Sequence, residues 1–484
     1  MALEFMEPIA KFIPSIKGPT SPLSLKEKLF WTGIVLVVYF ILYNTYAFGI
    51  NQAEVTNPLF ELISIIFAAK IGSLITIGIG PIVLASILLQ LFNGAGLIKF
   101  DQNNMEEKAR FQSMQKLAAI VLGIVESFIF VLTGYVPVSN HAMIGAVILQ
   151  LVIGAITIIY LDEIMTKWGI TSGINLFIAS GVSYDIIAGT LGILLPGAIT
   201  AIQTGGATAI SEAVLAFAPL LFSIIVFLIS IYAYEIKVEL PLVFEQLRGI
   251  GGRLPIPFLY VSVLPVILAT SLEMSLTVWF RIIANVHGAF ANFTKFIALY
   301  QPVNGQLQLN GGLVYLISPT FPLPYPAPAG IGGYRQYFTY LLTHTTQLFL
   351  PFGGVLAVPE WIHIIVYTVV LVILCIVFGK FWIEMTGQSP KHVADQLQSV
   401  GWQIPGFRRD PRIIENVLNK YIPTVTVLGS IFVGLLAAFA TLTGALGTGM
   451  GILLTVGILY MLYQQLEQEH LYEAYPILNK IVKE

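Results

Sequence analysis

Long apolar runs, each bounded by charged residues or by Gly and Pro, recur along the whole chain. Each run is about 20 residues long, the length at which a helix rising ~1.5 Å per residue crosses a hydrocarbon core of ~30 Å. The pattern predicts ten membrane-spanning helices, near 30–50, 73–97, 112–134, 141–161, 172–195, 213–235, 258–283, 359–385, 424–444 and 449–467. The expected fold class is therefore an all-α polytopic membrane protein.

An eleventh apolar run, residues 57–67, is too short to cross a bilayer and directly precedes the second span. Irregular backbone at membrane depth needs partners inside the protein. We therefore expect a short helix that dips into the protein rather than into lipid.

The basic residues predict the orientation of the spans. If the N-terminus is cytoplasmic, all but four of the 24 Lys and Arg residues fall in cytoplasmic segments; the exceptions are Lys70, Arg281, Lys295 and Arg335. This is the positive-inside bias, and a missed span would invert every later loop. Both termini are thus predicted to be cytoplasmic, in a multi-pass protein of the cell membrane.

Composition agrees with this class. Charged residues make up 10% of the chain, against roughly 25% in soluble proteins, which excludes a soluble enzyme. The single cysteine, Cys375, excludes an internal disulfide and a Cys-based zinc site. The first 29 residues mix Lys with Pro and lack a cleavage site, so we expect the first run to be retained as an anchor.

Ten spans divide into five and five, which predicts an N-terminal half, 1–196, and a C-terminal half, 197–484. Because five is odd, any relation between the halves would be an inverted repeat, with a functional path near the bilayer midplane. The long loop 284–358 in the second half is rich in Tyr, Pro and Gly. Within it, the alternation from Leu307 to Tyr315 around Asn310-Gly311-Gly312 predicts a hairpin.

Motifs of ATP-driven, metal-dependent or hydrolytic chemistry do not occur in the sequence, and no cofactor is expected. Glu126, Asp185 and Glu273 lie within spans, where ionisable residues can mark an ion or proton path. Without a Lys or His at matching depth, interior hydrogen bonding is the better interpretation of these three residues. An intramembrane enzyme would also need a nucleophile and a base, which the sequence does not supply.

Two segments, Ile71–Val83 and Gly169–Ile178, mix glycine and hydroxyl residues with β-branched ones. This composition permits close backbone approach on one face and presents a narrow aliphatic ridge on the other.

At these residues the sequence resembles the SecY family, the pore subunit of the Sec protein-conducting channel, and most closely its archaeal branch. The resemblance extends in order over nearly the whole chain. The other matching segments are Leu161-Asp162-Glu163, Val261–Leu268, Gly379–Gly387, Pro405-Gly406-Phe407-Arg408 and Gly444–Thr455.

The resemblance implies a clamshell of spans 1–5 and 6–10 around an hourglass pore, which opens sideways to lipid between spans 2/3 and 7/8. It assigns a constriction ring to Ile79, Val83, Ile174, Ile178, Ile267 and Leu454. It assigns a movable plug to the eleventh run, Asn57, Pro58, Leu59, Phe60, Glu61, Leu62, Ile63, Ser64, Ile65, Ile66 and Phe67. An aliphatic ring offers no hydrogen bond, so a narrow bore dewets, yet it has no chemistry that would hold a passing chain.

The same resemblance implies a ribosome-docking surface on cytoplasmic loops 6/7 and 8/9, formed by Arg248, Arg253, Arg408, Arg409 and Arg412. It also implies small single-span partners of the SecE and beta types, signal sequences and nascent polypeptides as cargo, and contact with membrane lipid. The alternative is an inverted-repeat secondary transporter, which would need convergent polar groups at the midplane. The sequence places glycine and aliphatic residues there instead.

Overall fold

The computed structural model describes residues 14–19, 21, 23–51, 68–94, 98, 105–132, 134, 136–204, 209–244, 251–261, 264–283, 291–303, 306–319, 333–350, 354–400, 402–403, 411–447 and 449–474. Within these ranges the chain forms two compact units. One comprises residues 1–184 and 454–484, and the other comprises residues 185–453. These units have other boundaries than the predicted halves, 1–196 and 197–484, which stay a prediction.

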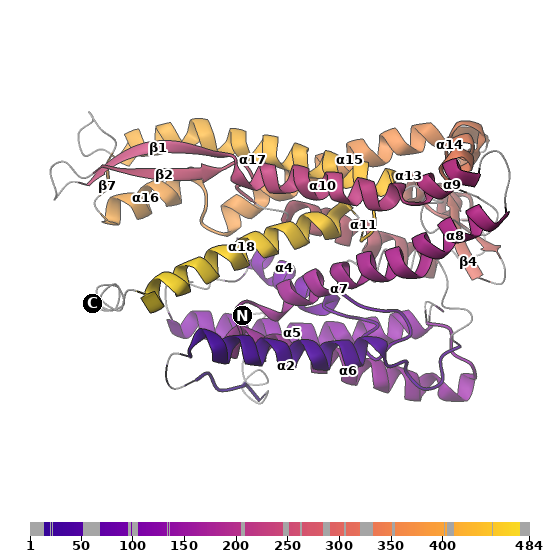
Figure 1. Cartoon of the computed structure of the whole chain (residues 1–484), viewed down its shortest axis with the longest axis horizontal. Helices are drawn as coiled ribbons and strands as arrows, with labels where there is room; N and C mark the ends of the chain where they lie inside the picture. The colour runs from indigo at the N-terminus through magenta and orange to yellow at the C-terminus, as the bar shows by residue number, and fades with distance from the viewer. Residues whose placement is uncertain are drawn as a thin grey trace. The chain divides into compact units, whose positions relative to one another are not determined.

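Helices lie at each of the ten predicted spans in the part of the chain that the structure describes (Figure 1). The principal ones are α2 (Leu25–Asn44), α4 (Gly80–Gly94), α5 (Met105–Leu132), α6 (Ile144–Trp168), α7 (Gly173–Gly189), α8 (Leu195–Thr204), α9 (Ala209–Ala216), α10 (Ala218–Glu235), α11 (Leu264–Ile283), α15 (Glu360–Met385), α17 (Pro411–Leu442) and α18 (Gly449–Ala474). A π-helical turn, Thr190–Leu194, joins α7 to α8. Six helical segments among the described residues are both long and apolar enough to cross a membrane.

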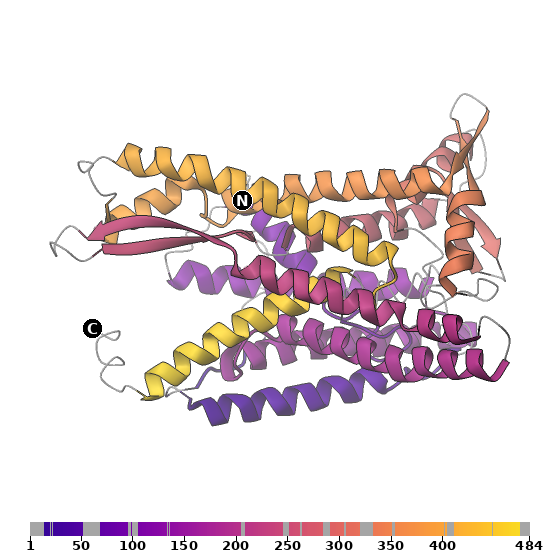
Figure 2. The same ribbon diagram turned by 45° about the horizontal axis from the view of Figure 1, so that its top comes forward.

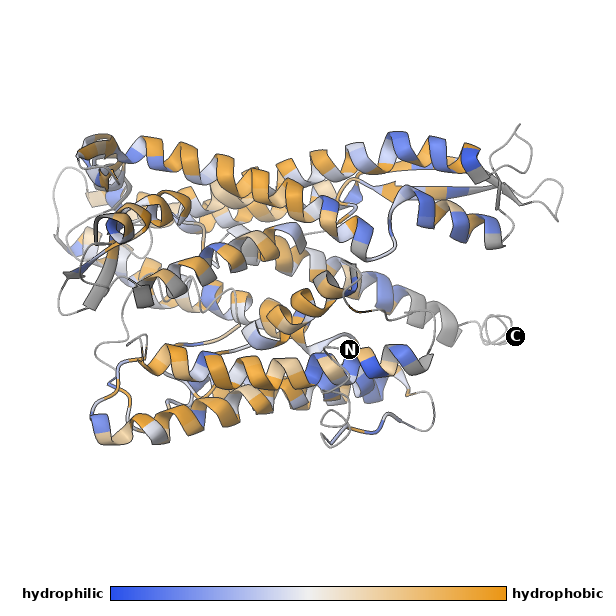
Figure 3. Cartoon of the chain, turned by 180° about the vertical axis from the view of Figure 1, so that it is seen from behind, coloured by the Kyte–Doolittle hydropathy of each residue, from blue (hydrophilic) through white to orange (hydrophobic). Residues whose placement is uncertain are grey.

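Shorter elements fill the loops. They are η2 (His141–Met143), α12 (Ala291–Ile297), α13 (Leu313–Ile317), α14 (Gly333–Thr343), α16 (Pro390–Val400), β1 (Lys237–Phe244), β2 (Gly251–Pro257), β3 (Leu299–Val303), β4 (Gln306–Gly311), β5 (Thr345–Phe349), β6 (Val355–Pro359) and β7 (Trp402–Gln403). The strands form two small sheets, of order β2-β1-β7 and β3-β4-β5-β6. Apolar residues follow the long helices, and hydrophilic residues gather toward helix ends and on the β1–β2 hairpin (Figure 3).

The second predicted span begins later than the sequence suggested. Residues 71–79 form successive turns, and α4 begins only at Gly80. Gly72 and Gly78 have φ of 86° and 59°, a region that interrupts a right-handed helix. The Ser73 and Thr76 hydroxyls donate to the carbonyls of Lys70 and Ser73, at 2.7 and 2.6 Å, and so compete with helical bonding.

The hairpin predicted around Asn310-Gly311-Gly312 was also wrong in position. Strands β3 and β4 pair in antiparallel register with Val303 opposite Gln306, so the hairpin lies six residues earlier along the chain. At the predicted site β4 ends, and Gly312, with φ of 92°, begins α13. In the sequence, the two strands are separated by Asn304-Gly305, a dipeptide typical of two-residue hairpin turns.

In the first unit, α5 packs on α4 and α6, and α2 packs on α6. The Tyr39 ring of α2 stacks on Phe177 of α7, with centroids 4.7 Å apart, and both side chains are fully buried. Gly154 of α6 lies against the 71–79 turns so closely that a Cβ there would collide with the Leu74 carbonyl oxygen. The turns are therefore fixed in place by α6.

In the second unit, α15 packs along α17 and α11, and α16 packs on α17. Close approach depends on small residues, as at Gly434 of α17, where a Cβ would lie 3.1 Å from the Val372 side chain. Cys375 is buried and has no cysteine partner, as the sequence requires. Figure 2 shows the β3–β6 sheet and α14 beside the first turns of α15.

Candidate functional site

The predicted ring residues of the first unit lie on two short, well-fixed segments and on α18. Ile79 ends the 71–79 turns, and the Val83 amide donates to its carbonyl at 3.1 Å, so these two residues are one helical turn apart. Ile174 and Ile178 are likewise one turn apart in α7. Ile79, Ile178 and Leu454 are buried at 1%, 3% and 4% exposure.

Ile267 lies in the first turns of α11, half-buried, and belongs to the second unit. The ring of six therefore draws on both units. It stays a prediction, and so does the lateral opening between spans 2/3 and 7/8.

The start of α7, which carries Ile174 and Ile178, is fixed by a carboxylate. Asp162 Oδ1 of α6 accepts a hydrogen bond from the Ile174 amide at 2.9 Å. Gly173 permits this approach, because a Cβ there would lie 2.6 Å from the Asp162 Cα. The sequence analysis places Asp162 in a matching segment but does not predict this positioning role, because Asp162 lies inside α6 and meets the start of α7 only in the folded chain.

Glu163, the next residue, holds the N-terminal segment. Its carboxylate pairs with Lys116 at 2.6 Å and with Lys167 at 2.8 Å, and it accepts from the Ile16 amide at 2.9 Å. Lys116 also donates to the Pro14 carbonyl at 2.6 Å, and Lys167 donates to the Ile16 carbonyl. The Trp168 indole N–H donates to the Lys17 carbonyl at 3.0 Å. Residues 14–17 thus form a strap across α5 and α6.

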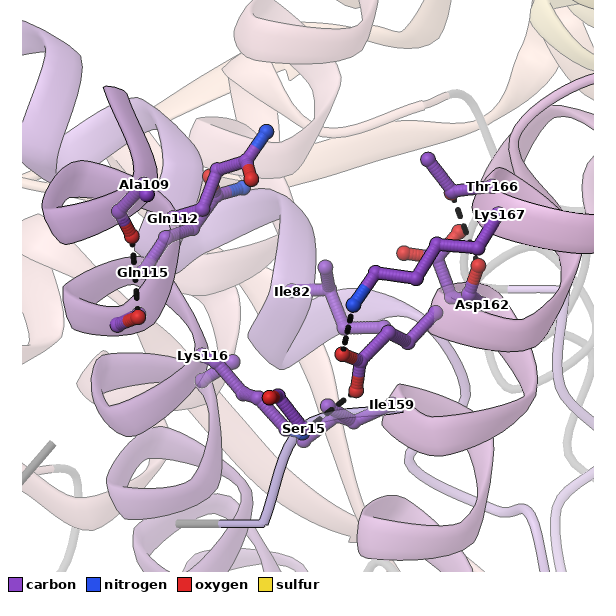
Figure 4. Close-up of a pocket in the computed structure, with 13 residues that line it drawn as sticks. Ser15, Ile82, Ala109, Gln112, Gln115, Lys116, Ile159, Asp162, Thr166 and Lys167 are labelled. Carbon is purple, nitrogen blue, oxygen red and sulfur yellow. Dashed lines mark hydrogen bonds and ion pairs between the residues drawn. The ribbon is translucent and has the colours of Figure 1, made fainter. Parts of the chain in front are cut away.

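Beneath the strap is a cavity of about 400 Å³ (Figure 4). Its walls come from α4, α5, α6 and the strap, and they carry amide, hydroxyl and charged groups: Ser15, Ile82, Ala109, Gln112, Ser113, Gln115, Lys116, Ala119, Ile159, Asp162, Glu163, Thr166 and Lys167. Because Lys116 and Lys167 already pair with Glu163, the cavity presents no excess positive charge.

The predicted plug, residues 57–67, lies outside the described residues, but the chain on both sides is anchored. Before it, the Asn51 amide donates to the Pro137 carbonyl at 2.9 Å. After it, Ala68 has a φ of 47°, and its carbonyl accepts from the Tyr39 hydroxyl at 2.8 Å. A non-glycine residue in this left-handed region turns the chain sharply at the segment's end.

The predicted docking loops are brought together by one sheet. Strand β1 pairs with β2 within loop 6/7 and, through Val243 and Phe244, with β7 of loop 8/9. Ile256 of β2 packs into an apolar cluster with residues of α16 and α17, which anchors the hairpin. Figure 1 shows the hairpin projecting beyond the end of α10.

Two of the five predicted docking arginines are described. Arg253 on β2 and Arg412 at the start of α17 are both exposed. Arg253 Nη1 pairs with Glu239 Oε2 on β1 at 2.7 Å, and this hydrogen bond holds the pKa of the Glu239 carboxyl below its ordinary value. Arg248, Arg408 and Arg409 lie outside the described residues.

The three ionisable residues within spans differ in their surroundings. Glu273 of α11 is 2% exposed, and neither of its carboxylate oxygens has a hydrogen-bond partner among the described residues. The interior hydrogen bonding expected of it is therefore not found there. Glu126 of α5 is half-buried, and Asp185 lies in α7. Within the described part of the chain no group of His, Cys, Asp and Glu has the arrangement of a metal site.

The long apolar helices define the class of a polytopic α-helical membrane protein. A solved protein-conducting channel shares 37% sequence identity and superposes with a TM-score of 0.74, covering 96% of this chain and 97% of that one. Sec61 in the canine ribosome–channel complex from the endoplasmic reticulum shares 36% identity, with a TM-score of 0.72 and coverage of 96% and 97%.

The sequence comparisons give the family. The SecY family model matches residues 73–463. The protein translocase subunit SecY of Methanococcus vannielii is 39% identical over 99% of both chains, and that of Methanocaldococcus jannaschii is 38% identical over 98% of both. The chain belongs to the SecY family. Its relatives are translocase subunits and protein-conducting channels, not secondary transporters.

Proposed function

We propose that this chain forms the pore of a Sec-type translocon, through which unfolded polypeptides cross the membrane. The observation that carries the proposal is the aliphatic character of the fixed segments at Ile79–Val83 and Ile174–Ile178, in a member of the SecY family. A ring of such side chains excludes water and ions at rest and deforms around any passing sequence. The chain would then be a passive conduit without chemistry of its own.

Apolar signal sequences and transmembrane segments would leave the pore sideways, between α4/α5 and α11/α15. Each Leu-like residue at the bilayer centre gains roughly 0.3–0.6 kcal/mol on entering lipid. Ten such residues supply several kcal/mol, which is enough to bias a gate of comparable energy. The free energy for lateral release would then come from the transfer of the apolar segment into lipid.

The β2-β1-β7 sheet would present the docking arginines to the ribosome. Its support is that one sheet unites loops 6/7 and 8/9, while Arg253 and Arg412 are exposed. The Sec61 relative is described in a ribosome–channel complex. Arginine suits phosphate-rich RNA because its planar donors bind phosphate oxygens in pairs. Small single-span subunits of the SecE and beta types would complete the assembly. The chain would lie in the cell membrane with both of its termini on the cytoplasmic side.

Planar-bilayer recordings of the purified channel test the proposal. Ile79→Asn with Ile174→Asn puts polar side chains into the constriction, so we expect a resting ion conductance that the parent chain lacks. The matched control is Ile79→Leu with Ile174→Leu, which keeps the ring apolar and should stay closed. Conductance equal in the two double variants would overturn the assignment of these residues.

A further inference from the structure

The segment between α11 and α15 folds into a compact body, here called the cap, comprising the described residues from 291 to 359. It contains α12, α13, α14 and the β3-β4-β5-β6 sheet. Its last strand, β6, runs directly into α15 at Pro359. The cap is therefore joined covalently to α15, and what matters is how firmly it also holds α15 and α11 through side chains.

On the α15 side, the cap is held by a buried polar network around Glu360 and His363, which are 0% exposed. Glu360 Oε1 accepts from the Tyr315 hydroxyl of α13 at 3.0 Å, and Oε2 accepts from the Thr346 hydroxyl of β5 at 3.1 Å. His363 Nδ1 lies 2.7 Å from Glu360 Oε1, and its Nε2 lies 2.9 Å from the Ser318 carbonyl oxygen.

The proton positions in this network follow from its acceptors. A carbonyl oxygen can only accept, so His363 Nε2 carries a hydrogen and donates it to Ser318. The short Nδ1–Oε1 contact then requires one proton between the imidazole and the carboxyl group. Every polar atom of the pair is thereby satisfied, the condition under which a buried network fixes one arrangement of its elements.

On the α11 side, the cap has separate contacts. The Tyr300 hydroxyl of β3 donates to the Thr277 carbonyl of α11 at 2.5 Å. Phe280 of α11 packs against an apolar cluster of the cap that includes Val314 and Tyr315 of α13. The Tyr315 ring also lies against His363, with centroids 4.4 Å apart. Helix α13 is thus wedged between α11 and α15.

We propose that the cap clamps α11 and α15 into one rigid leaf. The inference rests on the proposed function, in which α11 and α15 form one side of the lateral gate. When a signal sequence opens the gate, this leaf moves as a body, and the distance between α11 and α15 does not change. The cap then regulates the gate by forbidding an opening between the two helices of the same side.

Spin-label distances in the full-length channel test the clamp. In a Cys375→Ser background, labels at Ile283 and Ile365 report the distance within the leaf; Ile365 is 53% exposed on α15. We expect one narrow distance distribution, identical with and without a bound signal peptide. Combining Tyr300→Phe with Phe280→Ala removes the α11 contacts but leaves the Glu360 network, and should broaden the distribution. Tyr232→Phe, which removes a hydroxyl from a side chain 69% exposed on α10, is the matched control.

A change of the within-leaf distance when the signal peptide binds would overturn the clamp, because the helices would then move separately. A distribution that stays narrow in the Tyr300→Phe, Phe280→Ala variant would also overturn it. A further pair of labels, at Phe128 of α5 and Ile283, reports the gate itself. If the Phe128–Ile283 distance does not change when signal peptide binds, the proposed gate is wrong. The clamp is then still tested by the within-leaf distance in the Tyr300→Phe, Phe280→Ala variant.

Discussion

The Ile174 amide donates to Asp162 Oδ1 at 2.9 Å, so the first turn of α7 is fixed by the end of α6. Side-chain acceptors at helix starts satisfy amides that the helix itself leaves unbonded. Here the amide belongs to a predicted ring residue. The position of Ile174 is thus set by a polar contact outside the proposed constriction, which leaves the constriction itself apolar.

Asp162→Ala removes this acceptor, and we expect it to destabilise the chain by about 0.5–2 kcal/mol, the usual cost of a lost helix cap. If Ile174 closes the pore, the same variant should raise resting conductance. Asp162→Asn keeps an oxygen acceptor and is the control. Thermal unfolding in detergent and bilayer conductance measure the two effects, and equal behaviour of the two variants would refute the positioning role.

Much of the fold is predictable from the sequence because apolar length is a strong signal. A run of about 20 apolar residues has few alternatives to a membrane helix, and helices were found at all ten predicted positions among the described residues. Helix ends were less well predicted. The 71–79 turns are apolar apart from Ser73 and Thr76, and Gly72 and Gly78, with positive φ, distinguish them from the helix that follows.

The functional residues divide in a similar way. Aliphatic and glycine composition pointed to Ile79 and Ile174, since that pattern is local in sequence. The Glu360–His363 network was not predicted, because its partners Tyr315 and Thr346 are 45 and 14 residues from Glu360 along the chain. The β1–β7 pairing joins residues still further apart. Such contacts form only in the folded chain and produce no periodic pattern in the sequence.

Gly154 should tolerate no side chain. A Cβ would collide with the Leu74 carbonyl, so we expect Gly154→Ala to destabilise the chain by about 1–3 kcal/mol, as overpacking does. Gly145→Ala, in the same helix with nothing within 4 Å of the added Cβ, is the control. The midpoint of thermal unfolding should fall only for Gly154→Ala; equal midpoints would mean that α6 does not fix the 71–79 turns.

The predicted plug should move although the chain is anchored before it at Asn51 and after it at Ala68. In a Cys375→Ser background, a cysteine at Leu62 should crosslink to ring-adjacent positions at rest and lose that proximity when a nascent chain is engaged. A cysteine at Ala69, beyond the Ala68 anchor, should crosslink equally in both states. Persistent Leu62 crosslinking with an engaged chain would identify the segment as a static cover.

Ribosome affinity should depend on the pair Glu239–Arg253. Ionised Glu239 competes with phosphate for the Arg253 guanidinium, so Glu239→Gln should strengthen binding in co-sedimentation at low salt. The pKa of Glu239 lies below its ordinary value, and the pair is therefore intact at neutral pH. Affinity should rise as the pH falls through that pKa, and Glu239→Gln should abolish this rise. An unchanged affinity of Glu239→Gln would exclude Arg253 from the docking surface.

Arg408 should act in docking rather than in folding. Arg408→Glu should weaken ribosome binding and lower the slope of log affinity against log salt by about one per lost contact. Its expression and thermal stability should match the parent chain. Wild-type affinity of the variant at both low and high salt would show that the arginine cluster serves only to orient the loops.

The strap at residues 14–17 is anchored by hydrogen bonds of its own main-chain atoms, three carbonyls and one amide. Main-chain groups are the same in every residue except at proline, which lacks the amide hydrogen. The strap can therefore accumulate substitutions with little loss of anchoring, provided that position 16 does not become proline. Substitution is instead restricted at the residues whose side chains bind the strap, because no main-chain group can replace those side chains. They are Lys116, Glu163, Lys167 and Trp168. In this part of the protein, substitutions in the strap are expected to cost less anchoring than substitutions of the four side chains that hold it.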